Sequence, residues 1–141
     1  EDLLFDRATV LTPNLPELEH MAERELRDTG LMESAAAELA RTYNTHVLAK
    51  GGHSGANQVI DLLVAPDGKA LQYSHTRIET PHTHGTGCTL SSAIATLLGH
   101  GQTLEHAVTL ARNFVYRAIE AAPGYGAGNG PLGHQAVRTI T

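Results

Sequence analysis

The amino-acid sequence predicts an α/β layered fold, with a mainly parallel sheet flanked by helices and one β-hairpin. Short β-prone runs alternate with segments of helical periodicity, which is typical of chains that build such a sheet. Pro66-Asp67-Gly68 is a turn signal between two strand-like runs. Gly85-Thr86-Gly87 directly precedes a long apolar helical segment, and this order suits a loop that leads into a helix.

The first part of the chain alternates strand and helix. Residues 8–12 are β-prone and are stopped by Pro13, so they predict a buried strand. Asn14 is a suitable N-cap for the helix that follows it. Residues 31–43 predict a second, amphipathic helix. Residues 46–50 predict another strand, which the glycine pair after it should end.

The second part of the chain begins with the hairpin. Residues 59–64 and 71–78 are its expected strands. Residues 88–98 and 103–121 predict two helices, the second with an apolar stripe. The tail is rich in glycine, and Pro131 is a suitable start for a short terminal helix.

Composition narrows the classes of partner. The 141 residues and 41% hydrophobic content suit one globular domain with one core. The formal net charge is −5 and no Lys/Arg-rich run occurs, which argues against nucleic acid, because phosphate contacts need clustered cations. No apolar run is long enough to cross a bilayer, so a membrane partner is not expected. The single cysteine, Cys88, rules out an internal disulfide and suits the reducing cytoplasm.

The strongest indication of chemistry is the loop Gly85-Thr86-Gly87-Cys88. Its glycines allow a positive φ and a close approach of the backbone to a ligand. Unpaired amides and the helix dipole favour an anion there, or the charge that develops on a transferring phosphoryl group. Cys88 would then be a base or a nucleophile. The alternative is a glycine-containing loop with a small buried cysteine, since free cysteine is among the most buried residue types.

A metal interpretation of the same region also stays open. His82 and His84 are two apart and share a face of an extended segment, and imidazole together with the Cys88 thiolate suits zinc. No fourth ligand is evident nearby in the sequence.

Two positions in the first part of the chain suit a phosphate ligand. Asn14 and Glu17 follow a strand, and their amide and carboxylate could hold magnesium through water. Alternatively, they are an N-cap and an acidic first-turn residue that need no ligand. Lys50 ends a strand before two glycines, where a lysine can reach a phosphate in the crevice of an open α/β sheet. Its alternative is a solvated lysine at a turn.

Taken in order, four segments resemble the hydroxymethylpyrimidine/phosphomethylpyrimidine kinases of the ribokinase-like superfamily. They are residues 11–17 (LTPNLPE), 50–53 (KGGH), 83–91 (THGTGCTLS) and, more weakly, 128–132 (GNGPL). Most ribokinase-like enzymes have an aspartate base at the end of the glycine loop. Cys88 stands there in this chain, as in the pyrimidine kinases and some pyridoxal kinases.

The resemblance implies ATP-dependent phosphorylation of hydroxymethylpyrimidine and then of its monophosphate, in thiamine biosynthesis. It implies ATP and Mg²⁺ as cofactors and a small pyrimidine as the partner. It also implies that Cys88 is the base for the hydroxymethyl group, and that the amides of Gly85, Thr86, Gly87 and Cys88 form an anion hole.

The other implied roles concern the nucleotide. Lys50 would contact the ATP phosphates, while Asn14 and Glu17 would orient magnesium and its waters. Two rival functions fit the same segments. One is a pyridoxal kinase with the cysteine-type loop, and the other is a nucleotide-binding fragment without catalysis.

The resemblance covers nearly all of the chain but only about the C-terminal half of the family's fold. Residues 1–141 are therefore expected to be the nucleotide-binding, catalytic half of a single ribokinase-like domain whose N-terminal half is absent. That half alone is expected to be inactive, and to be either poorly soluble or associated through an open sheet edge, with a homodimer as the candidate assembly.

Overall fold

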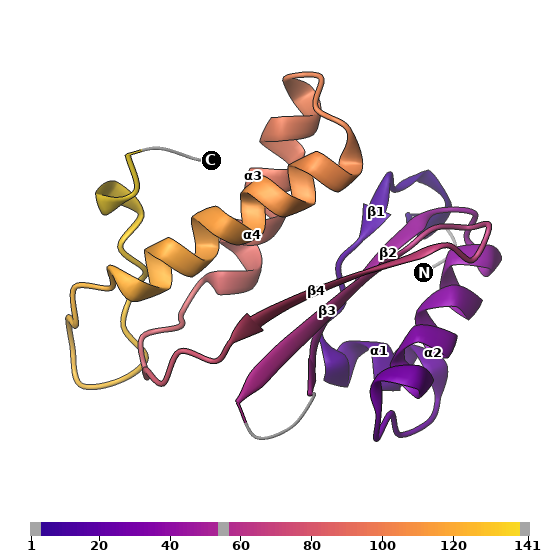
Figure 1. Ribbon diagram of the computed structural model, residues 1–141, viewed down its shortest axis with the longest axis horizontal. Helices are drawn as coiled ribbons and strands as arrows, with labels where there is room; N and C mark the ends of the chain where they lie inside the picture. The colour runs from indigo at the N-terminus through magenta and orange to yellow at the C-terminus, as the bar shows by residue number, and fades with distance from the viewer. Residues whose placement is uncertain (1–3, 54–56, 139–141) are drawn as a thin grey trace. The chain divides into compact units, whose positions relative to one another are not determined.

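The computed structural model describes residues 4–53 and 57–138. They form two compact units, Glu1–Arg77 and Ile78–Thr141. The first unit holds the sheet and two α-helices, and the second holds two further α-helices and the glycine-rich tail (Figure 1). Among the described helices, none combines the length and the apolar character that crossing a bilayer requires.

The sheet of the first unit has four strands. They are β1 (Val10–Leu11), β2 (His46–His53), β3 (Gln58–Val64) and β4 (Ala70–Thr76), in the spatial order β1-β2-β3-β4. The pairing of β1 with β2 is parallel, and the other two pairings are antiparallel. The α/β class and the hairpin β3–β4 are confirmed.

The mainly parallel sheet that the sequence predicts is not what these strands form. The reason lies in the connections between them. Residues 54–57 link β2 to β3 and residues 65–69 link β3 to β4. A parallel pair needs a crossover of about a dozen residues or more, so links this short return the chain antiparallel. Only α1 and α2, between β1 and β2, provide a crossover long enough for a parallel pair.

Strand β2 is longer than expected. It continues through Gly51-Gly52 to His53 instead of ending at the glycine pair. The register slips between Ala49 and Gly52, and Gly51 has a φ of 82°. The glycines therefore accommodate an irregularity within the strand, where a residue with a side chain would be strained.

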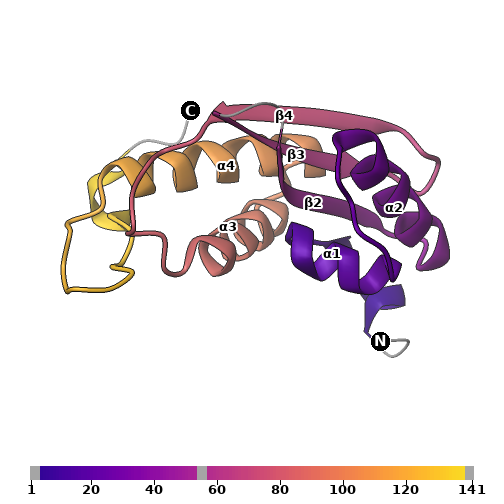
Figure 2. The same ribbon diagram turned by 90° about the horizontal axis from the view of Figure 1, so that it is seen from below.

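Two helices cover one face of this sheet. α1 (Leu15–Ala22) and α2 (Thr29–Thr42) pack against β2, and α2 also packs against β3 (Figure 2). α2 begins earlier than the sequence predicts because the Asp28 carboxylate accepts the Leu31 amide at 2.8 Å and caps it. Alternate residues of β2 and β3 enter this core, which follows from the period of two of a strand. The buried core residues are Leu18, Leu26, Met32, Ala35, Ala36, Leu39, Ala40, Val47, Ala49, Ile60, Leu62 and Val64.

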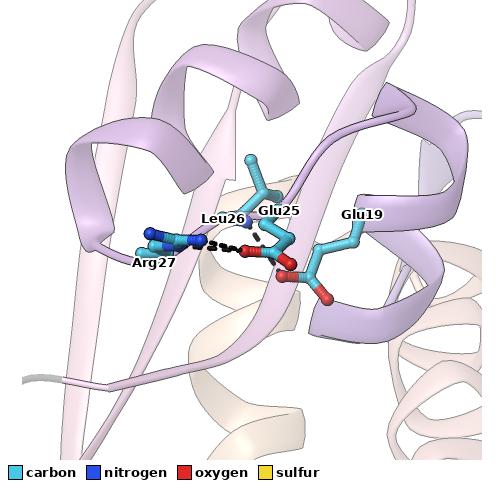
Figure 3. Close-up of polar contacts among 4 residues, drawn as sticks. All are labelled: Glu19, Glu25, Leu26 and Arg27. Carbon is cyan, nitrogen blue, oxygen red and sulfur yellow. Dashed lines mark hydrogen bonds and ion pairs between the residues drawn. The ribbon is translucent and has the colours of Figure 1, made fainter.

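The loop between α1 and α2 is held by a carboxylate. The amide of Leu26, a residue only 4% exposed, donates to Oε1 of Glu19 at 2.8 Å (Figure 3). Arg27 also pairs with Glu25 at 2.6 Å, but both side chains are largely exposed, so this pair adds little stability. The hydrogen bond to Glu19 gives the backbone amide of Leu26, a core residue, the acceptor that a buried amide needs.

The second unit is built on a pair of helices. α3 (Thr86–Gly99) and α4 (Leu104–Glu120) lie side by side in both views (Figures 1 and 2) and confirm the two helices expected there. Small and branched apolar residues face inward, as the helical period predicts. The buried residues are Leu90, Ile94, Ala107, Val108, Ala111, Val115 and Ala118. The expected terminal helix is a short 3-10 turn, η2 (His134–Ala136).

The tail returns to the end of α4 at Gly133. Its amide donates to the Ala118 carbonyl at 2.8 Å. A Cβ at Gly133 would collide with the carbonyl oxygen of Ala121, although the φ of −89° is open to any residue. The close approach of two backbone segments, and not the torsion angle, therefore requires glycine here.

This contact predicts that Gly133→Ala lowers the free energy of unfolding by about 1–3 kcal/mol, because a backbone carbonyl cannot move aside as a side chain can. Gly128→Ala is the matched control, since a Cβ there meets nothing within 4 Å. Thermal unfolding of the full-length protein measures both. Equal melting temperatures for the two variants would contradict the prediction.

Candidate active site

The turn before α3 has the conformation that the glycine loop predicts. Gly85 is the N-cap, with a φ of 85° and no side-chain capping bond. Its carbonyl accepts the Thr89 amide at 2.8 Å, the first bond of the helix. Gly87 and Cys88 lie in the first turn, where a helix offers its own amides no carbonyl partners. Their N–H groups and the helix dipole together favour an anion at this end of α3.

Thr86 differs from its neighbours in this turn. Its amide donates to the Thr83 carbonyl at 3.3 Å, and its hydroxyl donates to the same oxygen at 2.7 Å. The predicted anion hole counts Thr86 among four amide donors. In the structure, this amide already has a partner, and the residue ties the turn to the preceding loop.

Cys88 is exposed, so the alternative of a small buried cysteine is wrong. It borders a hollow of about 470 Å³ between α3, α4 and η2. Its lining residues are Cys88, Thr89, Ser92, Ala93, Thr96, Leu97, Ala111, Phe114 and His134. The thiol is therefore accessible next to a space large enough for part of a small molecule.

Sequence reasoning missed the aromatic end of this hollow. The rings of Phe114 and His134 stack with centroids 6.1 Å apart. Nε2 of His134 lies 2.8 Å from the Thr89 hydroxyl, one residue beyond Cys88. The weak family resemblance over residues 128–132 lies in this part of the tail, but it ends before His134.

The glycine-rich tail also contacts the loop in front of α3. The Gly130 amide donates to Nδ1 of His82 at 3.2 Å, and the His84 amide donates to the Gly130 carbonyl at 3.3 Å. Within residues 4–53 and 57–138, no three His, Cys, Asp or Glu side chains gather as metal ligands. The structure therefore gives His82 a structural partner, and it offers no support for zinc at His82, His84 and Cys88.

In the first unit, the structure brings Asn14 and Lys50 together. They form a parallel bridge just beyond β1, and the Lys50 amide donates to the Pro13 carbonyl at 2.9 Å. Because β1 and β2 run parallel, both residues lie toward the carboxyl ends of their strands, where open α/β sheets bind ligands. Lys50 is half-buried and Asn14 is exposed.

Asn14 and Glu17 form a reciprocal cap on α1. The Glu17 amide donates to Oδ1 of Asn14 at 2.9 Å, and the Asn14 amide donates to Oε2 of Glu17 at 2.8 Å. This is the capping box that the sequence alternative describes. A hollow of about 580 Å³ adjoins both residues. The cap holds two exposed oxygen-bearing side chains in fixed places.

A comparison with protein families gives this geometry its context. A family model described as "Phosphomethylpyrimidine kinase" matches residues 1–133. The chain belongs to the phosphomethylpyrimidine kinase family. The resemblance drawn from the four sequence segments is thus confirmed.

Similar curated proteins are named as pyrimidine kinases or for thiamine biosynthesis. The chain is 37% identical over 140 residues to the hydroxymethylpyrimidine/phosphomethylpyrimidine kinase of Bacillus subtilis. This match covers 98% of this chain and 51% of that kinase. It is 40% identical over 135 residues to the thiamine biosynthesis bifunctional protein ThiED of Geobacter sulfurreducens, covering 95% of this chain and 27% of that protein. The chain thus spans about half, or less, of these relatives.

Solved structures confirm the ribokinase-like fold. The pyridoxal kinase from Staphylococcus aureus in complex with ADP is similar, with a TM-score of 0.88 and 30% identity, over 99% of this chain and 52% of that one. Phosphomethylpyrimidine kinase from Clostridium difficile has a TM-score of 0.64 and 29% identity, over 82% of this chain and 45% of that one. The similarity to the pyridoxal kinase extends over nearly all of this chain and about half of that one.

The capping box yields a prediction about stability. Asn14→Ala removes the side-chain acceptor of the Glu17 amide, and we expect it to lower the free energy of unfolding by about 1 kcal/mol. Asn14→Asp keeps an acceptor and is the control. Urea unfolding of the full-length protein checks both variants. The cap would have no energetic role if the two variants had the same midpoint as the parent protein.

Proposed function

We propose that this chain is the nucleotide-binding, catalytic half of a kinase that phosphorylates hydroxymethylpyrimidine and then its monophosphate with ATP. One observation carries the proposal: in a member of the phosphomethylpyrimidine kinase family, an exposed Cys88 stands in the first turn of α3, a helix that Gly85 caps with a positive φ. The name of the Bacillus relative supports the pyrimidine substrate, and the name of the Geobacter relative supports a place in thiamine biosynthesis.

In the proposed reaction, the Cys88 thiolate takes the proton of the substrate hydroxymethyl group. The hydroxymethyl oxygen then attacks the γ-phosphorus of ATP, the bond to the β,γ-bridging oxygen breaks, and ADP leaves. The amides of Gly85, Gly87 and Cys88 stabilise the charge on the transferring group, while Thr86, whose amide is bonded to Thr83, holds the turn in place. Catalysis in such transfers depends mainly on positioning and charge stabilisation.

The nucleotide phosphates are assigned to the first unit. We propose that Lys50 contacts them from the end of β2, next to Asn14. Asn14 and Glu17 are exposed and offer oxygen atoms, the donor type that Mg²⁺ prefers, so they fit a magnesium ion held through water. The capping box uses one carboxylate oxygen of Glu17, Oε2, for the backbone. When bound, Mg²⁺ would neutralise charge on the phosphates.

Pyridoxal phosphorylation is a second candidate, because similar solved structures carry the name pyridoxal kinase. The curated relatives favour the pyrimidine instead. An assay of the full-length protein with ATP, magnesium and each acceptor distinguishes the two. Nucleotide binding without turnover on either acceptor would instead indicate the non-catalytic alternative.

We also propose that the full-length protein forms a homodimer, and light scattering, which measures its mass in solution, tests this.

The base assignment predicts that Cys88→Ala in the full-length protein lowers kcat by about 10²–10⁴-fold, the usual contribution of a general base. The affinity for ATP should change little, because the backbone amides remain. Thr109→Ala, an exposed change on α4, is the control. Steady-state kinetics and calorimetric ATP titration measure the two effects. Parent-level turnover in the alanine variant would remove Cys88 from the reaction.

A further inference from the structure

A β-bulge lies at Lys50. Ala49 pairs with Leu62 and Gly52 pairs with Ile60, so the two residues Lys50 and Gly51 stand opposite the single residue 61 of β3. Such two-against-one pairings break the ladder locally and redirect side chains. The bulge therefore sets the local backbone conformation at Lys50 and the direction of its side chain.

The residue opposite the bulge is Asp61, which is unusual for its place. The other β3 residues from Ile60 to Val64 are buried and apolar, whereas Asp61 is a carboxylate only 6% exposed. A buried carboxylate is costly unless hydrogen bonds compensate it. Its Oδ1 accepts the Gly51 amide at 2.9 Å, and this is one of the contacts that Asp61 makes.

This bond supplies what the bulge removes. In a regular antiparallel ladder, the amides of β2 that face β3 bond to its carbonyl groups. The bulge interrupts that pattern at Gly51, whose φ of 82° marks the break. The side chain of Asp61 takes the place of a carbonyl acceptor, so that the Gly51 amide does not remain unsatisfied.

Lys50 is thus held from two sides. Toward β1, its own amide donates to the Pro13 carbonyl at 2.9 Å. Toward β3, the next amide in the chain donates to Asp61 at 2.9 Å. The backbone on either side of the Lys50 Cα is fixed by hydrogen bonds of different origin, one from a main-chain group and one from a side chain.

We propose that Asp61 is a positioning residue for Lys50: by accepting the Gly51 amide, it fixes the bulge that presents the lysine to the nucleotide phosphates. The proposal rests on the role assigned to Lys50 in the proposed function. Asp61 acts through the backbone of β2 and does not itself contact the nucleotide. It explains why an acid occupies a place in β3 that its neighbours fill with apolar residues.

The test uses two variants of the full-length protein. Asp61→Asn keeps an oxygen acceptor of the same shape, whereas Asp61→Val fits a buried strand but accepts no hydrogen bond. We expect the valine variant to weaken ATP binding on the order of tenfold, with a smaller effect on kcat, and the asparagine variant to stay close to the parent. Asp67→Asn, at the exposed hairpin turn, is the control.

Amide hydrogen exchange at Gly51 is the readout that does not depend on activity. Exchange should become faster in the valine variant and remain slow in the asparagine variant. Equal ATP affinity of the valine variant and the parent, or equal losses in the asparagine and valine variants, would overturn the proposal.

Two further variants, Gly51→Ala and Lys50→Ala, separate the role of the bulge from the role of the lysine. Gly51→Ala disturbs the bulge without touching Asp61, because the positive φ disfavours a side chain while a Cβ there meets nothing within 4 Å. It should weaken ATP binding as the valine variant does, and it decides the test if that variant fails to fold. Unchanged ATP affinity in Lys50→Ala would refute the lysine's proposed role. Weaker ATP binding in Lys50→Ala, together with parent-level ATP affinity in Gly51→Ala, would refute the role of the bulge and leave the role of the lysine standing.

Discussion

The arrangement of the first unit depends on one parallel pairing. The hydrogen bond from the Lys50 amide to the Pro13 carbonyl extends the β1–β2 pair beyond the short strand β1. Because the two strands run parallel, their carboxyl ends meet, and with them the residues proposed to handle phosphate. An antiparallel pairing of the same segments would have carried Asn14 and Lys50 to opposite ends of the sheet.

Polar groups next to this pairing serve the backbone first. Asn14 and Glu17 cap α1, and Asp61 satisfies the amide exposed by the bulge. A side chain fixed in this way loses little further conformational freedom when a ligand binds, which reduces the entropic cost of binding. The structural interpretation of the Asn14–Glu17 pair and the functional one are therefore compatible.

The sequence predicted the features that depend on local chemistry. Gly85 indicates the start of α3 and Gly68 in Pro66-Asp67-Gly68 indicates the hairpin, because each of these two turns needs a residue with positive φ. It did not predict the pairing direction of β2 and β3, which depends on the length of a link between them. Nor did it predict the bulge at Lys50 or the place of His134 beside Phe114, since both depend on which segments meet in space. The paired glycines after Lys50 are the local sign of the bulge, but a glycine pair indicates the end of a strand equally well.

The anchors of the candidate site are hydrogen bonds from backbone amides, to carbonyl groups or to side-chain oxygens, and the positive φ of Gly51 and Gly85. Arg24–Glu38, Arg27–Glu25 and Lys69–Asp67 are ion pairs on the surface, and none of these residues belongs to the candidate site. The Lys69 backbone amide donates to the Asp67 carboxylate and lowers the pKa of that carboxyl, but the group is exposed at the hairpin turn. Salt screens exposed pairs far more than it affects backbone bonds. The geometry of the site should therefore be insensitive to ionic strength, and any salt dependence of nucleotide binding would arise from the charges of Lys50 and the phosphates themselves.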